Sequence, residues 1–249
     1  MPADTLSRDA RHLALPQVGA DGQQKIAGGT ALLIGAGGIG CAAATYLASS
    51  GIGHLLISDF DTVDETNLGR QVLYRPGDVG ELKAKVAAAR LRTINPDVRV
   101  TPITERLSGA ALTEAVASAD VVLDGCDNFS TRFEVNDACV AANRRLVAGS
   151  AIRLEGQLAV FGPDYQDSPC YRCLYAEADE SLGNCAGNGV LSPVPGVIGT
   201  MMAVEALKFL AGVGSILPVL RLYDAIAVEL KSLSLKKRSD CAACSPGDR

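Results

Sequence analysis

Aromatic residues and histidines are scarce in this chain of 249 residues. It contains no tryptophan, aromatic residues make up 4% of it, and its two histidines are His12 and His54. So few aromatic rings argue against a stacking platform for the bases of a nucleic acid. The net charge is −5, and no run of basic residues is longer than Lys236-Lys237-Arg238. A nucleic-acid-binding face is normally basic, so we expect no nucleic-acid partner.

Signals for export or for a membrane span are also lacking. The first sixteen residues contain no apolar core of the length that a signal peptide needs. The most apolar long stretch, residues 194–213, carries Glu205 and Lys208. Each charge would cost about 2.5–3.5 kcal/mol at the centre of a bilayer, which favours a buried helix. We therefore expect a cytoplasmic protein that does not associate with membranes.

Hydrophobic residues make up 48% of the chain, enough to bury the core of one domain over residues 1–249. Strand-like runs are expected at 31–34, 55–58, 98–103, 120–123 and 146–148, and helix-like runs lie between them at 41–49, 81–93, 110–117 and 129–142. This alternation predicts an α/β fold with a Rossmann-like, mostly parallel sheet flanked by helices. After Gly149 the pattern changes. Residues 156–162 and 220–235 favour antiparallel strands, and a long helix is expected from 196 to 211.

A nucleotide-binding turn is predicted where the first strand ends. The segment LIGAGGIG runs from Leu33 to Gly40 and contains the pattern Gly35-x-Gly37-x-x-Gly40 before an alanine-rich helix. Glycines let the backbone approach a phosphate, and the helix N-terminus attracts it. Asp59 ends the second strand, where an acid can bind ribose hydroxyls. These features fit NAD and ATP equally well.

Three observations favour ATP over NAD. Neither histidine lies where hydride transfer would need a proton donor, and no tyrosine has a lysine four residues later. The third is that Asn67, Arg70, Lys83 and Asp127 follow strand ends and suit a triphosphate with Mg²⁺. Taken singly, Arg70 could be a surface ion pair, and Lys83 could belong to a solvated helix face. Their convergence is what favours ATP.

Four cysteines form two C-x-x-C pairs, Cys170 with Cys173 and Cys241 with Cys244. Two such pairs suit a tetrahedral zinc ion with a structural role. The alternatives are two unrelated pairs or a redox-active pair. A redox pair is disfavoured because neither opens a helix after a thioredoxin-like strand.

The other four cysteines divide into two kinds. Cys185 lies in the glycine-rich segment 183–189 and is a candidate for covalent chemistry. The alternative is an exposed thiol on a loop that closes over the substrate. Cys41, Cys126 and Cys139 lie within or beside apolar segments and are interpreted as small core residues.

Taken in order, these motifs resemble the ThiF/MoeB/HesA family, bacterial relatives of the ubiquitin-activating enzyme. Members adenylate the C-terminal glycine of ubiquitin-like sulfur carriers. The resemblance rests on Gly35–Gly40, Asp59-Phe60-Asp61, Asn67-Leu68-Gly69-Arg70-Gln71, Gly80-Glu81-Leu82-Lys83, Ile94-Asn95-Pro96, Asp124-Gly125-Cys126-Asp127-Asn128, the segment 151–157, both cysteine pairs and Pro195-Gly196-Val197-Ile198-Gly199. The ordered set is far more specific than any one motif.

The resemblance assigns roles to individual residues. It implies that Gly38 and Asp59 hold ATP, that Arg70 and Lys83 bind its phosphates, and that the pair Asp127-Asn128 places Asp127 at Mg²⁺. It also implies that the four paired cysteines bind Zn²⁺. Cation and metal contacts of this kind stabilise the charge that develops on a phosphate.

The resemblance also implies partners. The family's N-terminal Arg-Tyr-x-Arg-Gln pattern is here Arg8-Asp9-Ala10-Arg11-His12, which departs from it at two positions. Arg11 would reach the neighbouring subunit's site in a homodimer. No rhodanese-like extension follows Arg249, so a separate protein would donate sulfur. The carrier would be of the ThiS or MoaD type, for thiamine or molybdopterin. An NAD-dependent oxidoreductase and a non-catalytic scaffold of the same fold remain alternatives.

Overall fold

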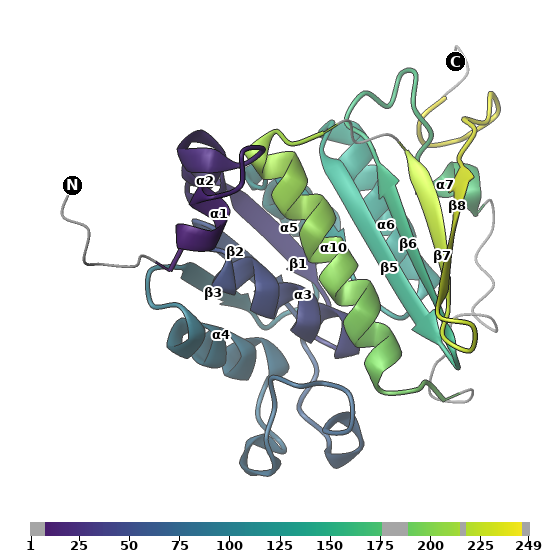
Figure 1. The fold of residues 1–249 in the computed structure, drawn as a ribbon. Helices are drawn as coiled ribbons and strands as arrows, with labels where there is room; N and C mark the ends of the chain where they lie inside the picture. The colour runs from purple at the N-terminus through teal and green to yellow at the C-terminus, as the bar shows by residue number, and fades with distance from the viewer. Residues whose placement is uncertain (1–7, 176–188, 215–217, 246–249) are drawn as a thin grey trace.

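In a computed structural model of the protein, residues 8–175, 189–214 and 218–245 are described. They form a single eight-stranded sheet with helices on both faces (Figure 1). The order of the strands across it is β3-β2-β1-β4-β5-β6-β7-β8. Neighbours among the first five are parallel, and β6, β7 and β8 are antiparallel to their neighbours. The predicted α/β class and its change of pattern are both confirmed.

The strands are β1 (Thr30–Ile34), β2 (His54–Ser58), β3 (Arg99–Ile103), β4 (Val121–Asp124), β5 (Arg145–Ile152), β6 (Glu155–Phe161), β7 (Val219–Asp224) and β8 (Glu229–Ser234). The apolar runs of β1 and β4 are buried along almost their whole length. Strands that are apolar at every position are expected where helices cover both faces of a parallel sheet. Every residue of β8, at the edge of the sheet, is exposed.

One face of the sheet carries α2 (Gly19–Gly28), α3 (Gly38–Ser49), α4 (Lys83–Ile94) and α10 (Pro193–Ala211), which share one apolar core with it. The other face carries α5 (Gly109–Ser118), α6 (Phe129–Ala141) and α7 (Tyr171–Leu174), with a second core. Within the described ranges, the remaining short helices are α1 (Ala10–Leu13), η1 (Glu65–Asn67) and η2 (Pro76–Asp78). Figure 1 shows α3 and α10 lying together on the near face.

The close approach of α3 and α10 depends on glycine. A side chain at Gly199 would place its Cβ 2.1 Å from the carbonyl oxygen of Ile39. No residue with a Cβ fits there, so glycine is required for the two helices to touch. Since α3 begins directly after the glycine turn, this contact anchors the turn to the core.

The helix α10 is long and apolar enough to cross a membrane by length and composition alone, but half of it is buried inside this fold. Its buried Glu205 accepts hydrogen bonds from Lys208 at 2.9 Å and from Arg221 of β7 at 2.7 Å. A buried carboxylate paired with two cations belongs to a helix packed in a protein core. The prediction of a buried helix is confirmed, although it begins three residues earlier than expected.

Several boundaries differ from the predictions; the strand expected at 146–148 extends over 145–152, and the helix expected from 41 begins at Gly38. Residues 220–235 form a hairpin of two strands, because Asp224 accepts hydrogen bonds from the amides of Ile226 and Ala227 and turns the chain. The helix expected from residue 81 begins at Lys83, because Leu82 instead forms a β-bridge with Thr62.

Candidate active site

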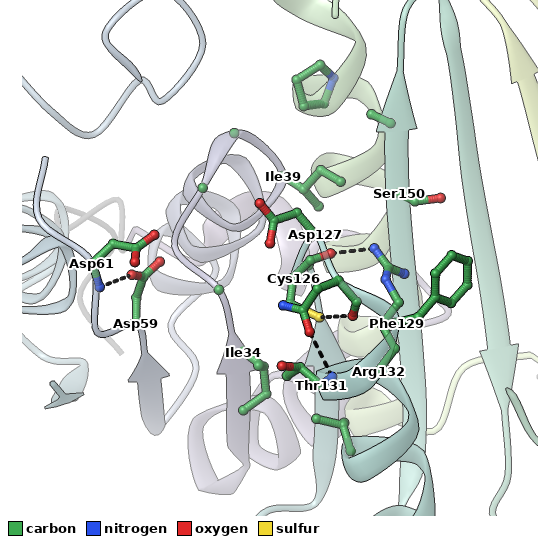
Figure 2. Close-up of a pocket in the computed structure, with 18 of the residues that line it drawn as sticks. Ile34, Ile39, Asp59, Asp61, Cys126, Asp127, Phe129, Thr131, Arg132 and Ser150 are labelled. Atoms are coloured by element: carbon green, nitrogen blue, oxygen red, sulfur yellow. Dashed lines mark hydrogen bonds between the residues drawn. The ribbon is translucent and has the colours of Figure 1, made fainter. Parts of the chain in front are cut away.

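A cavity of about 710 Å³ opens at the carboxyl ends of β1, β2, β4 and β5. In α/β sheets, ligands bind at the carboxyl ends of the strands. Figure 2 shows Asp59 and Asp61 on one side of the cavity, with Asp127, Arg132 and Ser150 on the other. Segments that are far apart in the sequence therefore meet here, as the sequence predicted.

The glycine turn forms the floor between these two sides. Gly35 has φ +85°, and a Cβ there would lie 3.1 Å from the backbone of Gly125. At Gly40 a Cβ would lie 1.9 Å from the carbonyl oxygen of Gly35. Gly37 and Gly38 line the cavity, and α3 starts at Gly38. The helix N-terminus and the bare turn together make a site for a phosphate.

Asp59 joins the glycine turn to the end of β2. Its Oδ2 accepts a hydrogen bond from the amide of Ala36 at 2.7 Å, and its Oδ1 accepts one from the amide of Asp61 at 2.9 Å. Burial raises the pKa of Asp59, and Lys83 and these amides offset that rise only in part. The carboxyl group thus lies at the cavity wall, in the position where an acid of this fold binds ribose hydroxyls.

Two predicted cations line the same side. Lys83 is 7% exposed, and its Nζ lies 3.1 Å from Asp61 Oδ2. Arg70 donates from Nη1 to the carbonyl oxygen of Thr66 at 3.1 Å. Asn67 also lines the cavity, and its Oδ1 accepts from the amide of Asp64, closing the first turn of η1. The loop after β2 therefore presents an arginine and an amide beside the glycine turn.

Asp127 lies on the opposite side, three residues beyond the end of β4. Its side chain is exposed to the cavity, and in Figure 2 its carboxylate points into the open space. The next residue, Asn128, begins α6: its Oδ1 accepts from the amide of Thr131 at 2.8 Å. This N-cap fixes the loop that carries Asp127. Asn128 thus has a structural task that the sequence prediction did not include.

The interpretation of Cys126 as a core residue is right only in part, because the residue packs against the core under α5 and α6 but is not fully buried. Cys126 is half-buried and lines the cavity, because the amide of Cys126 bonds Asp124 Oδ1 at 3.0 Å and turns the loop inward. Burial and the nearby Asp124 raise the pKa of its thiol, so it stays protonated at neutral pH. Cys41 and Cys139 are buried in the core, as predicted.

No pattern in the sequence indicated the role of Arg132. This buried residue of α6 donates from Nη2 to the carbonyl oxygens of Cys126 and, at 2.9 Å, of Gly149. Burial alone would lower its pKa, but Asp124 raises it. Arg132 thus ties the loop after β4 to β5. In the sequence it is one more charged residue on a helix, so periodicity could not distinguish it.

The cavity continues beyond the nucleotide motifs along β5 and β6. Ser150, Arg153 and Gln157 line this part with Tyr175, whose hydroxyl donates to Gln157 Oε1 at 2.6 Å. Residues 151–155 entered the sequence analysis only through the resemblance, whereas 156 and 157 also belong to the strand predicted at 156–162. Residues on the two strands lie opposite one another, Ser150 facing Gln157, and this depends on the register of β5 against β6.

The paired cysteines come together at a second site. The four sulfur atoms of Cys170, Cys173, Cys241 and Cys244 lie within 4.8 Å of one another. The amide of Arg238 points to the sulfur of Cys173 at 3.4 Å. Four sulfur donors in this arrangement fit a closed tetrahedral zinc site with no position for a reacting water.

Two predicted residues lie apart from the cavity. Arg11 is exposed on α1 and does not line the cavity of its own subunit. Cys185 lies outside the residues that the structure describes, so its role stays a prediction from the sequence.

Residues 10–243 match the sequence model of the ThiF family. The chain belongs to the ThiF family. It is 44% identical over 237 residues to the sulfur carrier protein ThiS adenylyltransferase of Escherichia coli, covering 95% of this chain and 94% of that protein. It is 42% identical over 228 residues to the molybdopterin-synthase adenylyltransferase of the same organism, covering 90% of each.

Two further relatives come from other organisms, and one of them is much longer than this chain. The chain is 43% identical to the adenylyltransferase and sulfurtransferase MOCS3 of Sus scrofa, spanning 97% of this chain but only 53% of that protein. It is 40% identical to the SAMP-activating enzyme E1 of Haloferax volcanii, covering 99% of this chain and 92% of the relative.

Solved structures show the same fold. The crystal structure of Escherichia coli MccB with MccA-N7isoASN superposes with a TM-score of 0.82 at 23% identity, covering 97% of this chain and 75% of that one. At this identity the likeness establishes the architecture and nothing more.

Proposed function

We propose that this protein adenylylates the C-terminal glycine of a ubiquitin-like sulfur carrier protein, using ATP and releasing pyrophosphate. The observation that carries the proposal is that the glycine turn, Asp59, the two cations Arg70 and Lys83, and Asp127 all line one cavity. The relatives named adenylyltransferases support the same activity.

The chemistry needs no general base, which agrees with the scarcity of histidine. The attacking group is the carrier's terminal carboxylate, which is already ionised at neutral pH. One of its oxygen atoms forms a bond to the α-phosphorus of ATP. The bond between that phosphorus and the oxygen that joins it to the β-phosphate breaks, and this oxygen leaves with the pyrophosphate. The products are an acyl-adenylate and pyrophosphate. The protein's task is to bring two anions together and stabilise the charge that develops.

Each side of the cavity supplies a part of this task. Asp59 would bind the ribose, and the turn of Gly35, Gly37 and Gly38 would hold phosphate. Arg70 and Lys83 would neutralise the phosphates, with Asn67 beside them. The residues Ser150, Arg153, Gln157 and Tyr175 would leave room for the carrier's terminal peptide on the far side of Asp127.

Two metal ions complete the proposal. Asp127, exposed on the cavity and next to the N-cap Asn128, would hold Mg²⁺, which prefers carboxylate and phosphate oxygens. Magnesium supplies positive charge to the phosphates when it is bound. The four paired cysteines would hold Zn²⁺, which joins the segment after β6 to the end of the chain.

The proposal includes partners. The carrier would be of the ThiS or MoaD type, and a separate protein would donate sulfur to the adenylate. In a homodimer, Arg11 would complete the cavity of the partner subunit, since it lies away from the cavity of its own.

The test is exchange of labelled pyrophosphate into ATP with purified ThiS-type and MoaD-type carriers. Exchange should require both a carrier and Mg²⁺, and Asp127→Ala should abolish it while the circular dichroism spectrum stays that of the wild type. Absence of exchange with every carrier, from folded protein containing its metal, would overturn the proposal. The carrier that supports exchange would also identify the pathway.

A further inference from the structure

The cavity has an apolar wall that none of the nucleotide motifs supplies. It is made by Ile34 at the end of β1, Leu107 before α5, Leu112 in α5 and Val135 in α6. Ile34, Leu112 and Val135 belong to the same buried cluster, and Leu107 packs against it. These residues therefore form one continuous surface, on the side of the sheet that α5 and α6 cover.

An ion pair lies beside this apolar wall. Arg106 Nη2 lies 3.5 Å from Glu134 Oε1, and the two residues are the chain neighbours of Leu107 and Val135. Arg106 lines the cavity, and its side chain is 52% exposed. An exposed ion pair adds little to stability, typically about 0 to 1 kcal/mol. Its main effect here is to hold the guanidinium between the loop before α5 and the helix α6.

The other cations that line the cavity among the described residues are placed differently. Lys83 is paired with Asp61, Arg70 follows η1, and Arg132 is buried against backbone carbonyl groups. Arg153 lies at the turn between β5 and β6. Arg106 is thus the lining cation that adjoins the apolar wall rather than the phosphate motifs or β5.

The purine ring is the planar, uncharged part of ATP, and its two faces suit apolar and stacking contacts. A guanidinium is planar and weakly hydrated, and it stacks on aromatic faces, which an ammonium group does less well. We propose that the apolar wall and Arg106 form a purine pocket in which the Arg106 guanidinium stacks on the base, with Glu134 as the residue that positions it. This inference rests on the proposed function, because it takes ATP as the occupant of the cavity.

The experiment is titration calorimetry of the whole protein with Mg-ATP and, separately, with magnesium and inorganic tripolyphosphate, which has no base. Arg106→Met keeps the length of the side chain but removes its charge and its planar group. It should raise the Kd for ATP about three- to tenfold, the size of one cation–π contact. Arg106→Lys should weaken ATP as well, because it keeps the charge without the plane. The Kd for tripolyphosphate should stay within about twofold of the wild type in both variants.

Glu134→Gln tests the positioning. It should weaken ATP by a smaller factor than Arg106→Met, and the double variant should be no worse than Arg106→Met alone, because the two residues act through one contact. Arg90→Met is the matched control: Arg90 pairs with Asp78 at 3.2 Å but does not line the cavity, so ATP affinity should not change. Thermal unfolding of each variant verifies that it is folded.

Different results overturn different claims. An unchanged ATP affinity in folded Arg106→Met and Arg106→Lys would refute the stacking contact. A parallel loss of tripolyphosphate affinity would show that Arg106 binds phosphate and would refute it too. If Arg106→Met does not fold, Arg106→Lys and Glu134→Gln decide the matter by the same comparison. Wild-type protein that binds tripolyphosphate but not ATP would overturn the proposed function itself.

Discussion

Lys83 Nζ lies 3.1 Å from Asp61 Oδ2, so this buried lysine of the cavity wall has an anionic partner within its own chain. The lysine side chain is 8% exposed and the aspartate side chain 57%. The aspartate is thus the partner that water, or an incoming nucleotide with its metal ion, can reach. The pair keeps the charge of a buried lysine compensated while it points to the cavity.

We expect Lys83→Met to lower the rate of carrier-dependent pyrophosphate exchange at least tenfold, about the effect of losing one charged contact to the transition state. Lys85 provides the matched control, because it lies on the same helix but is exposed and away from the cavity. Lys85→Met should exchange at the wild-type rate. Equal rates in the two variants would show that Lys83 is an ordinary helix residue.

Removal of the metal should affect stability before it affects chemistry. We expect elemental analysis to find one zinc per chain in protein purified without chelator, and Cys173→Ser to reduce that content and lower the Tm. Cys126→Ala should keep the full zinc content, because its sulfur belongs to the cavity and not to the cluster. Protein without zinc and with an unchanged Tm would contradict the structural role.

Mixed dimers can test the assignment of Arg11. Arg11→Ala and Asp127→Ala should each be inactive alone. In the first variant every cavity lacks the arginine that the neighbouring subunit would supply, and in the second every cavity lacks its own aspartate. A hybrid of the two contains one complete site, so mixing them should restore up to about half of the activity per dimer that bears both variants. Labelled subunits must show that exchange between dimers has occurred. Exchange without recovery of activity would refute the contribution in trans.

Glu205 should make the free energy of unfolding depend on pH in the acidic range. Burial would raise its pKa, but hydrogen bonds from Lys208 and Arg221 outweigh burial and lower it. A carboxyl group with a lowered pKa stabilises the fold above its usual value of 4.5, and this contribution is lost as the pH falls through the lowered value. Glu205→Gln should therefore reduce the free energy of unfolding by roughly 3 kcal/mol at pH 7, the scale of a broken buried pair.

The measurement for Glu205 is urea unfolding of the wild type and Glu205→Gln between pH 3 and pH 8. The difference should begin to shrink as the pH falls below the usual pKa of 4.5, where the carboxyl group of the unfolded chain takes up a proton, and should be gone below the lowered pKa of the folded state. A difference that is constant across this range would mean that the effect comes from packing and not from charge.

Much of the fold could be predicted because it depends on local patterns. Strands such as β1 and β4 are short apolar runs, and the segments between them have the periodicity of helices. This alternation of strand and helix was enough to predict the parallel half of the sheet. The glycine turn and the acids at strand ends were also predictable, since parallel strands bring their carboxyl ends to one edge. The hairpin of β7 and β8 was only a run of strand-like residues until the turn at Asp224 was known.

The contacts across the cavity could not be predicted in the same way. Arg132 donates a hydrogen bond to a carbonyl group of β5, and Tyr175 donates one to Gln157 of β6. No repeating pattern in the sequence links the two residues of either pair, so the pairing was not predictable. Cys126 shows the same limit: its apolar neighbours indicated the core, which it does contact, but they did not show that it also lines the cavity. Such relationships depend on how elements pack.

The cysteine cluster changes what kinds of variation the chain can tolerate. When its four thiolates share an ion, the stretch from Cys173 to Cys241, which contains α10, β7 and β8, becomes a closed ring. The entropy of closing a flexible ring grows only with the logarithm of its length, so doubling the length costs about 0.6 kcal/mol. Insertions between α10 and β7 should therefore lower the free energy of unfolding only slightly. The ends of such an insertion would be held by the rest of the ring, whatever its length.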